Sequence, residues 1–141
     1  MHARSIGQVP IGSQLAHGSK QGGELKSERL VAANLANLDN GEIIELGSGI
    51  GNIQEVIPRC VKTDLFPNPW IDRVENEFQL SCADATVSDL ILFDVFHHLR
   101  YPGTALQEFR RVLKPGDRVP IFDPYMSMFA TRLLIVLEKK S

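Results

Sequence analysis

Short apolar runs, separated by glycines, prolines and acids, dominate the chain after about residue 25. Runs of this length, without alternating polar positions, are typical of strands buried on both faces of a parallel sheet. The pattern predicts five such strands, at residues 42–46, 60–64, 78–82, 90–93 and 118–122. The fourth of these runs, Leu-Ile-Leu-Phe, carries the strongest strand pattern in the chain.

Helical spacing of apolar residues appears between these runs. It predicts helices near residues 27–38, 52–56 and 104–113. Thr104 and Gln107 have the spacing of a capping box, and Lys114, Pro115 and Gly116 end that helix. The tail from about residue 126 to 140 fits a helix or a strand equally well.

Strands that alternate with helices predict an α/β fold, namely a Rossmann-like, doubly wound and mostly parallel sheet. We expect a flexible N-terminal segment at residues 1–24, where no periodicity appears, and one domain at residues 25–141. Ligands of such sheets bind at the carboxyl ends of the strands. That edge would gather residues 47–51 with Asp64, Asp84 and Asp94.

Composition is that of an ordinary soluble protein. The chain has 141 residues, of which 43% are hydrophobic and 23% charged, and its formal net charge is −2. This charge gives no general attraction to nucleic acid or to an anionic membrane. Cys60 and Cys82 form neither a disulfide framework nor a zinc motif. From the cysteine spacing we expect no structural metal. No stretch has the length of a membrane span, so we expect a cytoplasmic protein.

The sharpest chemical motif is the glycine-rich turn after the first predicted strand. Glu45 stands just before the turn, which contains Gly47, Gly49 and Gly51 and is followed by Asn52. Glycines permit a tight turn and close approach of a ligand to the backbone. A dinucleotide fingerprint would need glycine at position 52, so an NAD site is disfavoured. The acid before the turn favours a ligand that carries an amine.

The glycine turn and the acids that follow the next two predicted strands come in the same order as the motifs of class I S-adenosylmethionine-dependent methyltransferases, which this chain resembles. Asp64 follows the second predicted strand and Asp84 the third. The segment Phe-Asp-Val-Phe-His-His-Leu at 93–99 is similar to the fourth motif of that family. Leu-Lys-Pro-Gly at 113–116 is similar to the loop that follows it.

The resemblance covers about residues 27–125 and implies a site for S-adenosylmethionine. The glycines would surround its methionine part and ribose, and Glu45 would face its amino group. Asp64 would accept hydrogen bonds from the ribose hydroxyls, and Asp84 from the adenine amino group. Taken alone, the turn and both acids also fit purely structural roles. The implied cofactor-binding residues are Glu45, Gly47, Ser48, Gly49, Gly51, Asp64, Leu65, Ala83, Asp84, Ala85 and Asp94.

Catalytic candidates follow the fourth predicted strand. Asp94 is placed to contact cofactor or acceptor, and His97 to act as a base on the acceptor. The alternative for His97 and His98 is that they shape the pocket or cap the next turn. Methyl transfer depends mainly on alignment, so no residue identifies the acceptor. We expect a small molecule or a precursor related to lipids or the cell envelope, and not a nucleic acid.

The C-terminal part departs from the family pattern. The family's sheet ends in an antiparallel pair of strands beside strand five, whereas this chain offers one further element and looks truncated after about five strands. Strand five is then expected to be an edge, which would tolerate Pro120. The tail or a second copy, forming a homodimer, would cover that edge. Asp123-Pro124-Tyr125 is interpreted as the turn that starts a helix.

These departures, with Asp117 where a glycine is usual, leave a second interpretation open. The chain would then be a catalytically degenerate domain that binds a cofactor or a partner. A third interpretation, an NAD-dependent oxidoreductase, is disfavoured by Glu45 and Asn52.

Overall fold

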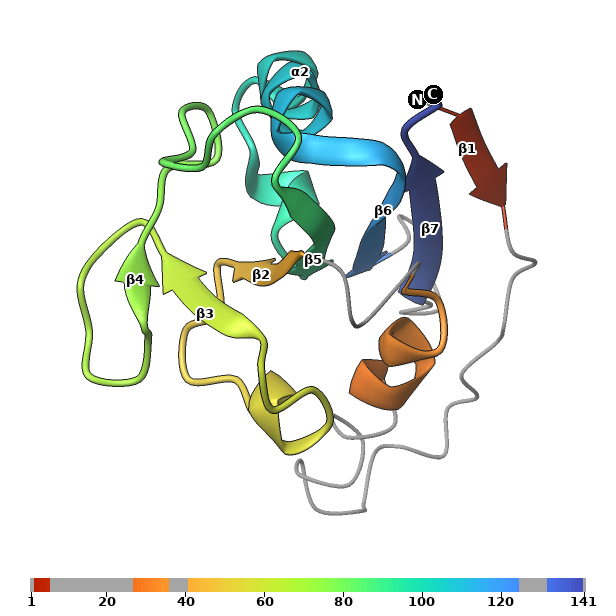
Figure 1. Cartoon of the computed structure of the whole chain (residues 1–141). Helices are drawn as coiled ribbons and strands as arrows, with labels where there is room; N and C mark the ends of the chain where they lie inside the picture. Colours follow the sequence, from red (N-terminus) through yellow and green to blue (C-terminus); the bar gives the residue numbers. More distant parts are fainter. Residues whose placement is uncertain (1, 6–26, 36–40, 125–131, 141) are drawn as a thin grey trace.

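A seven-stranded sheet organises the protein (Figure 1), in the order β1-β7-β6-β5-β2-β3-β4. The computed structural model describes residues 2–5, 27–35, 41–124 and 132–140. The strands are β1 (His2–Ser5), β2 (Glu42–Leu46), β3 (Val61–Asp64), β4 (Arg73–Val74), β5 (Val87–Phe93), β6 (Leu113–Pro124) and β7 (Arg132–Glu138). The helical elements are residues 27–32, the 3-10 helices η2 (Ile53–Glu55) and η3 (Phe96–His98), and the helix α2 (Pro102–Val112).

Five of these strands, from β2 to β6, are parallel to one another, whereas β7 pairs antiparallel with both β6 and β1. From β2 the chain proceeds outward through β3 and β4, and then returns to β5 on the other side of β2. This reversal confirms the Rossmann-like, doubly wound α/β fold. It also places the switch point, where ligands bind in such sheets, at the carboxyl ends of β2 and β5.

The apolar core is divided between the two faces of the sheet. Leu46 and Leu92 pack on one face with Phe109 of α2. Ile43 and Val31 belong to the cluster on the other face, beside η2. Figure 1 shows α2 and the helix at residues 27–32 on opposite sides of the sheet. Because the central strands are covered on both sides, their sequences read as continuous apolar runs.

The predicted helix at 104–113 exists, but its start was predicted wrongly. It begins at Pro102, Tyr101 occupies the N-cap position, and no side chain makes a cap hydrogen bond. Pro102 suits the first turn because its φ is already helical and its missing N–H would be unpaired there. Thr104 therefore lies inside the helix.

None of the helices in the described part of the chain is long and apolar enough to cross a membrane.

The third strand does not lie at residues 78–82, as the pattern predicted. That segment forms no strand, and β4 pairs with β3 in its place. Arg73 of β4 is held by Glu42, 2.8 Å away, and by Glu75, 2.7 Å away. Phe78 and Leu80 instead pack against the core from a loop. The pattern correctly identified Phe78 and Leu80 as residues that pack on the core, but a loop holds them there and not a strand.

The prediction that strand five is an exposed edge is wrong, because β7 pairs with β6 from Arg118 to Pro124. An edge of β6 is therefore not available for a homodimer. Residues 134 and 136 face one core cluster and residues 135 and 137 the other, so the apolar tail is buried as a strand. Pro120 lies opposite Val136 in an interior strand.

Strand β1 was not predicted. It lies in the segment expected to be flexible, yet His2–Ser5 pairs with β7 on the side that faces away from β6. The other residues of that segment lie outside the described part of the chain. Strands β7 and β1 occupy the place beside the fifth parallel strand where the family pattern has its last two strands, although β1 comes from the start of the chain.

Candidate functional site

The glycine-rich turn connects β2 to η2 at the switch point. Gly47 and Gly49 have φ values of +66° and +52°, in the left-handed region that favours glycine. A Cβ atom at Gly47 would lie 2.6 Å from Cγ2 of Val95, so the loop after β5 packs directly on the turn. A Cβ atom at Gly49 would meet nothing within 4 Å. The turn is thus tight on its inner side and open on its outer side.

Ser48 and Thr63 anchor this turn to β3. The N–H of Ser48 donates to the carbonyl oxygen of Thr63 (2.8 Å), and the N–H of Thr63 donates to Oγ of Ser48 (3.2 Å). The hydroxyl of Thr63 donates to the carbonyl oxygen of Glu45 at 2.8 Å. Thr63 is fully buried. The predicted site residue Ser48 is therefore part of the scaffold of the turn.

Asp64 lies at the end of β3, directly beside the turn. Its Oδ2 accepts the N–H of Gly49 at 3.1 Å, and its Oδ1 accepts the N–H of Leu65 at 2.7 Å. Each carboxylate oxygen has about two acceptor positions, so neither oxygen is saturated. The structure therefore brings Asp64 and the glycines together as the sequence predicted.

Glu45 is buried beneath the turn, with 3% of its surface exposed. Its pKa is raised to about 7, chiefly by burial and also by the charge of Glu28, while the hydrogen bond with Ser48 and the charge of Lys62 act in the opposite direction. Its Oε2 has no hydrogen-bond partner among the described residues. An unpartnered buried acceptor is costly, and a bound cation would supply the missing partner. The site thus fits a ligand that presents an amine at Glu45 and hydroxyls at Asp64.

Asp84 lies in the turn that leads into β5, because the strand predicted before it does not form. The N–H of Glu42 donates to the carbonyl oxygen of Thr86, which places this turn at the amino ends of β2 and β5. The prediction that Asp84 shares the carboxyl edge with the glycine turn and Asp64 is therefore wrong.

The exposed carboxylate of Asp84 contacts Nη1 of Arg111 at 2.7 Å. Arg111 also donates to the carbonyl oxygens of Leu80 and Cys82, and it pairs with Glu108. Its guanidinium lowers the pKa of Glu108. Arg111, which the sequence analysis missed, organises the loop that carries Ala83, Asp84 and Ala85.

Two predicted site residues have an unusual backbone. Ala85 and Asp94 have φ values of +52° and +55°, and they are the only non-glycine residues with positive φ in the described ranges. Such conformations cost about 1–3 kcal/mol and concentrate at functional sites. The N–H of Asp94 donates to the carbonyl oxygen of Phe122, which fixes the end of β5 against β6.

His97 and Asp123 meet at the same edge of the sheet. The backbone N–H of His97 donates to Oδ2 of Asp123 at 2.8 Å, and Nδ1 lies 3.4 Å from the same oxygen. Asp123 belongs to the last residues of β6, so its interpretation as the start of a helix is wrong. The rule that acids follow parallel strands, which identified Asp64, would also have found Asp123.

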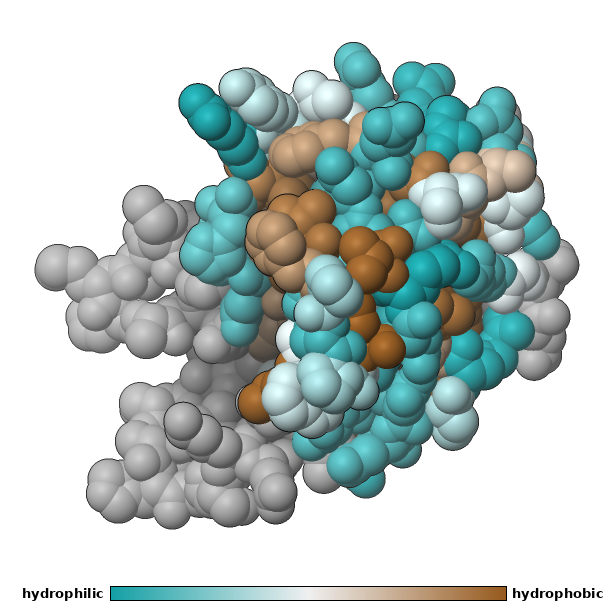
Figure 2. All heavy atoms as spheres, turned by 90° about the vertical axis from the view of Figure 1, so that its left-hand side faces the viewer, coloured by the Kyte–Doolittle hydropathy of each residue, from teal (hydrophilic) through white to brown (hydrophobic). Residues whose placement is uncertain are grey.

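An apolar patch lies beside Asp64, on β4 and on the loop that leads to it from β3. Leu65, Phe66, Trp70 and Val74 are 41–73% exposed. Figure 2 shows hydrophobic residues gathered on the face that carries this loop, with hydrophilic residues around them. A patch of this kind often marks a site of interaction.

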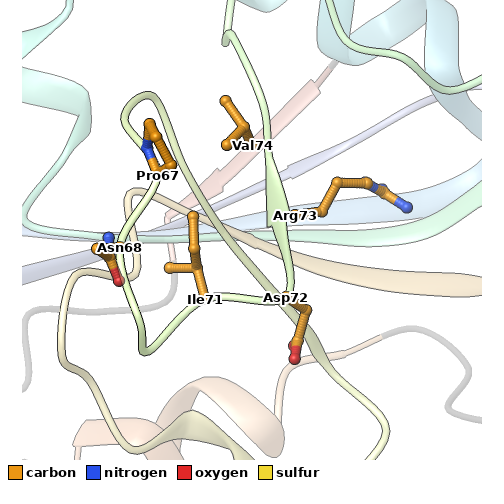
Figure 3. A pocket seen from close by; sticks show the side chains of 6 residues that line it. All are labelled: Pro67, Asn68, Ile71, Asp72, Arg73 and Val74. Atoms are coloured by element: carbon orange, nitrogen blue, oxygen red, sulfur yellow. The ribbon is translucent and has the colours of Figure 1, made fainter.

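A shallow hollow of about 170 Å³ lies on the same loop, with Pro67 and Asn68 on one arm and the remaining residues on the other (Figure 3). It is smaller than typical ligand sites, and no predicted site residue lines it. Its lining residues are Pro67, Asn68, Ile71, Asp72, Arg73 and Val74. We therefore assign the chemistry to the carboxyl edge of the sheet and not to this hollow.

A doubly wound sheet with a glycine-rich turn at its switch point and an acid after the next strand is common to nucleotide-binding folds of this type, and the antiparallel β7 beside β6 is the addition of the class I S-adenosylmethionine-dependent methyltransferase fold. A family profile described as a methyltransferase domain matches residues 44–120, which is more than half of the chain. The chain belongs to this methyltransferase family. It matches no curated protein.

Solved structures with the same fold include proteins of different activities. The cyclase SpnF superposes with a TM-score of 0.64 at 15% identity, over 84% of this chain and 52% of its own. The PH0226 protein from Pyrococcus horikoshii OT3 gives 0.63 at 18% identity, over 77% and 60%. An S-adenosylmethionine-dependent methyltransferase from Thermotoga maritima gives 0.60 at 17% identity, over 72% and 52%. The chain thus spans about half the length of these structures.

Proposed function

We propose that the protein binds S-adenosylmethionine at the carboxyl edge of β2, β3 and β5, and that it transfers the methyl group to an acceptor. The observation that carries this proposal is the pair of carboxylates on either side of the glycine turn. Glu45 is buried with an unpartnered Oε2, and Asp64 accepts the N–H of Gly49 with room for further donors. This set matches an amine and a ribose diol on one ligand.

The remaining cofactor contacts follow from position along the same edge. The backbone of Gly49 and Gly51 would approach the methionine part, because the outer side of the turn is open at Gly49. Exposed Leu65 would pack on one face of the adenine ring. Ala83, Asp84 and Ala85 lie before β5, at the amino ends of the strands, so they are not among the proposed cofactor contacts. The bound cofactor supplies a methyl group activated by a positively charged sulfur.

Residues after β5 are the candidates for handling the acceptor. Val95 contacts Gly47, so the loop that carries Asp94 and His97 lies against the turn that would hold the methionine part. Asp94 would contact cofactor or acceptor, and His97 would hold a proton from the acceptor. Alignment of acceptor and methyl group would supply most of the rate.

The acceptor class is proposed from the surface around the edge. The apolar patch beside Asp64 and the net charge of −2 favour a small molecule, or a lipid- or envelope-related precursor, over nucleic acid. Free Cys60 and Cys82 fit a reducing, cytoplasmic location. We place the proposed cofactor site in the domain at residues 25–141, whose sheet β1 extends at the β7 edge.

Thermal unfolding with added ligands tests the cofactor. S-adenosylmethionine or its demethylated product at 100 times its dissociation constant should stabilise the protein by roughly 2.7 kcal/mol, a shift of several degrees. NAD should give no shift. The variant Asp64→Ala should lose the shift, and Asp117→Ala, at the opposite end of β6, should keep it. A cooperatively folded wild-type sample without any shift would contradict the proposal.

A further inference from the structure

An acid at the end of β6 holds the histidine that follows β5. We propose that Asp123 is a positioning residue for His97, and that it keeps the imidazole proton on Nδ1 so that Nε2 can accept the proton of an acceptor hydroxyl. This inference rests on the proposed methyl transfer but concerns a contact within the chain. It names the class of acceptor as a hydroxyl compound.

The geometry joins Asp123 to both the main chain and the ring of His97. Oδ2 accepts the backbone N–H at 2.8 Å and lies 3.4 Å from Nδ1. The second distance is longer than a good hydrogen bond, as is common for catalytic pairs without their ligands. Oδ1 is buried and has no hydrogen-bond partner among the described residues. The carboxylate of Asp123 therefore keeps accepting capacity beyond its bond to the backbone N–H of His97.

The surroundings favour one orientation of the imidazole. The side chain of Asp123 is 13% exposed, while that of His97 is 39% exposed. The ring of His98 packs against that of His97, with the two centroids 3.8 Å apart. A neutral imidazole has one donor and one acceptor nitrogen, and the partner of one nitrogen decides the state of the other. With Nδ1 facing an acceptor, Nε2 is the basic nitrogen.

The proton transfer explains why the acceptor would be a hydroxyl. As the acceptor oxygen bonds to the methyl carbon, the bond from that carbon to sulfur breaks and its electron pair stays on sulfur. The hydroxyl proton passes to Nε2 of His97, and the resulting imidazolium later returns it to water. A hydroxyl is poorly ionised near neutral pH and benefits from this base, whereas a thiol depends on it less.

Long-range ¹H–¹⁵N correlation spectra of the full chain, in alkaline buffer where imidazoles are neutral, reveal the tautomer directly. Spectra of His97→Gln and His98→Gln assign the signals. We expect His97 to carry its proton on Nδ1 in the wild type. In Asp123→Ala the Nε2–H form should become the major one, and in Asp117→Ala the Nδ1–H form should persist.

The outcome does not depend on the cofactor. A wild-type His97 with its proton on Nε2 would overturn the inference, even if Asp123→Ala does not fold. An Nδ1–H tautomer that persists unchanged in folded Asp123→Ala would overturn it as well. The thermal shift with S-adenosylmethionine, measured on the same samples, reports separately on the proposed function. It should be retained in Asp123→Ala, because Asp123 is not among the proposed cofactor contacts.

Discussion

The backbone N–H of Gly49 donates to Oδ2 of Asp64 across 3.1 Å, and this bond links the glycine turn after β2 to the acid that ends β3. One carboxylate therefore shapes the turn and also faces the proposed ribose position. Its two functions can be separated, because the bond to Gly49 affects folding and the acceptor positions left over affect binding.

Replacing Asp64 tests this arrangement. Hydrogen bonds to a charged group contribute about 1.5–3 kcal/mol each, so loss of two ribose contacts in Asp64→Ala should weaken S-adenosylmethionine binding by roughly 100-fold or more. Stability should also fall, by about 1.5 kcal/mol for each of the backbone bonds from Gly49 and Leu65 to this carboxylate. Calorimetric titration measures the affinity, with Asp117→Ala as the matched control. Equal affinities in both variants would refute the assignment of Asp64.

The two left-handed glycines of the turn should respond differently to alanine. Both substitutions impose the cost of a left-handed residue, about 1–2 kcal/mol. Only Gly47→Ala also places a Cβ atom 2.6 Å from Val95, whereas Gly49→Ala meets open space. The free energy of unfolding should therefore fall by about 1–3 kcal/mol more at Gly47 than at Gly49. Urea unfolding measures both values.

A second substitution separates the overlap at Gly47 from the backbone strain. Val95→Ala removes the methyl group that the introduced Cβ atom would meet, so the double variant should recover part of the loss caused by Gly47→Ala alone. Additive effects of the two substitutions would show that Val95 does not restrict the turn.

Arg111 should be irreplaceable by lysine. Its guanidinium bridges Asp84, Glu108 and the carbonyl oxygens of Leu80 and Cys82, and an ammonium cannot reproduce this planar set of donors. We expect Arg111→Lys to lower the melting temperature and to speed amide hydrogen exchange in residues 80–85. The neighbouring exposed Arg110→Lys is the control, and it should change neither. Identical exchange in the two variants would exclude Arg111 as the organiser of this loop.

Much of the fold follows from local patterns. The strands β2, β3 and β5 were predicted because their apolar runs end in a glycine turn or an acid. Strand β4 was missed because it has two residues, and its position depends on the ion pairs of Arg73 with distant Glu42 and nearby Glu75. Strand β1 was missed because its only partner in the sheet is β7, at the other end of the chain.

The residues of the candidate site that lie at the carboxyl end of a parallel strand could be predicted from the sequence. Glu45, the glycines and Asp64 meet because parallel strands end at one edge of the sheet. The role of Arg111 was not predictable, since Leu80, Cys82 and Asp84, its partners outside the helix, lie in a loop without regular structure. The partner of His97 lies at the end of a strand that pairs with β5, so its contact depends on sheet order as well as pattern.

Glu45 should make stability fall as pH rises. Burial raises its pKa in the folded protein to about 7 from an ordinary value of 4.5. The folded state then binds more protons than the unfolded state, so the stabilisation is complete below about pH 4.5 and is lost as pH rises through about 7. The loss amounts to ~3 kcal/mol.

The variant Glu45→Gln should not show this loss of stability, whereas Glu55→Gln, at an exposed position, should lose stability like the wild type. Urea unfolding at several pH values measures the difference, and parallel curves for Glu45→Gln and wild type would contradict the raised pKa. Saturating S-adenosylmethionine should reduce the loss in the wild type, because a bound amine favours the ionised carboxylate.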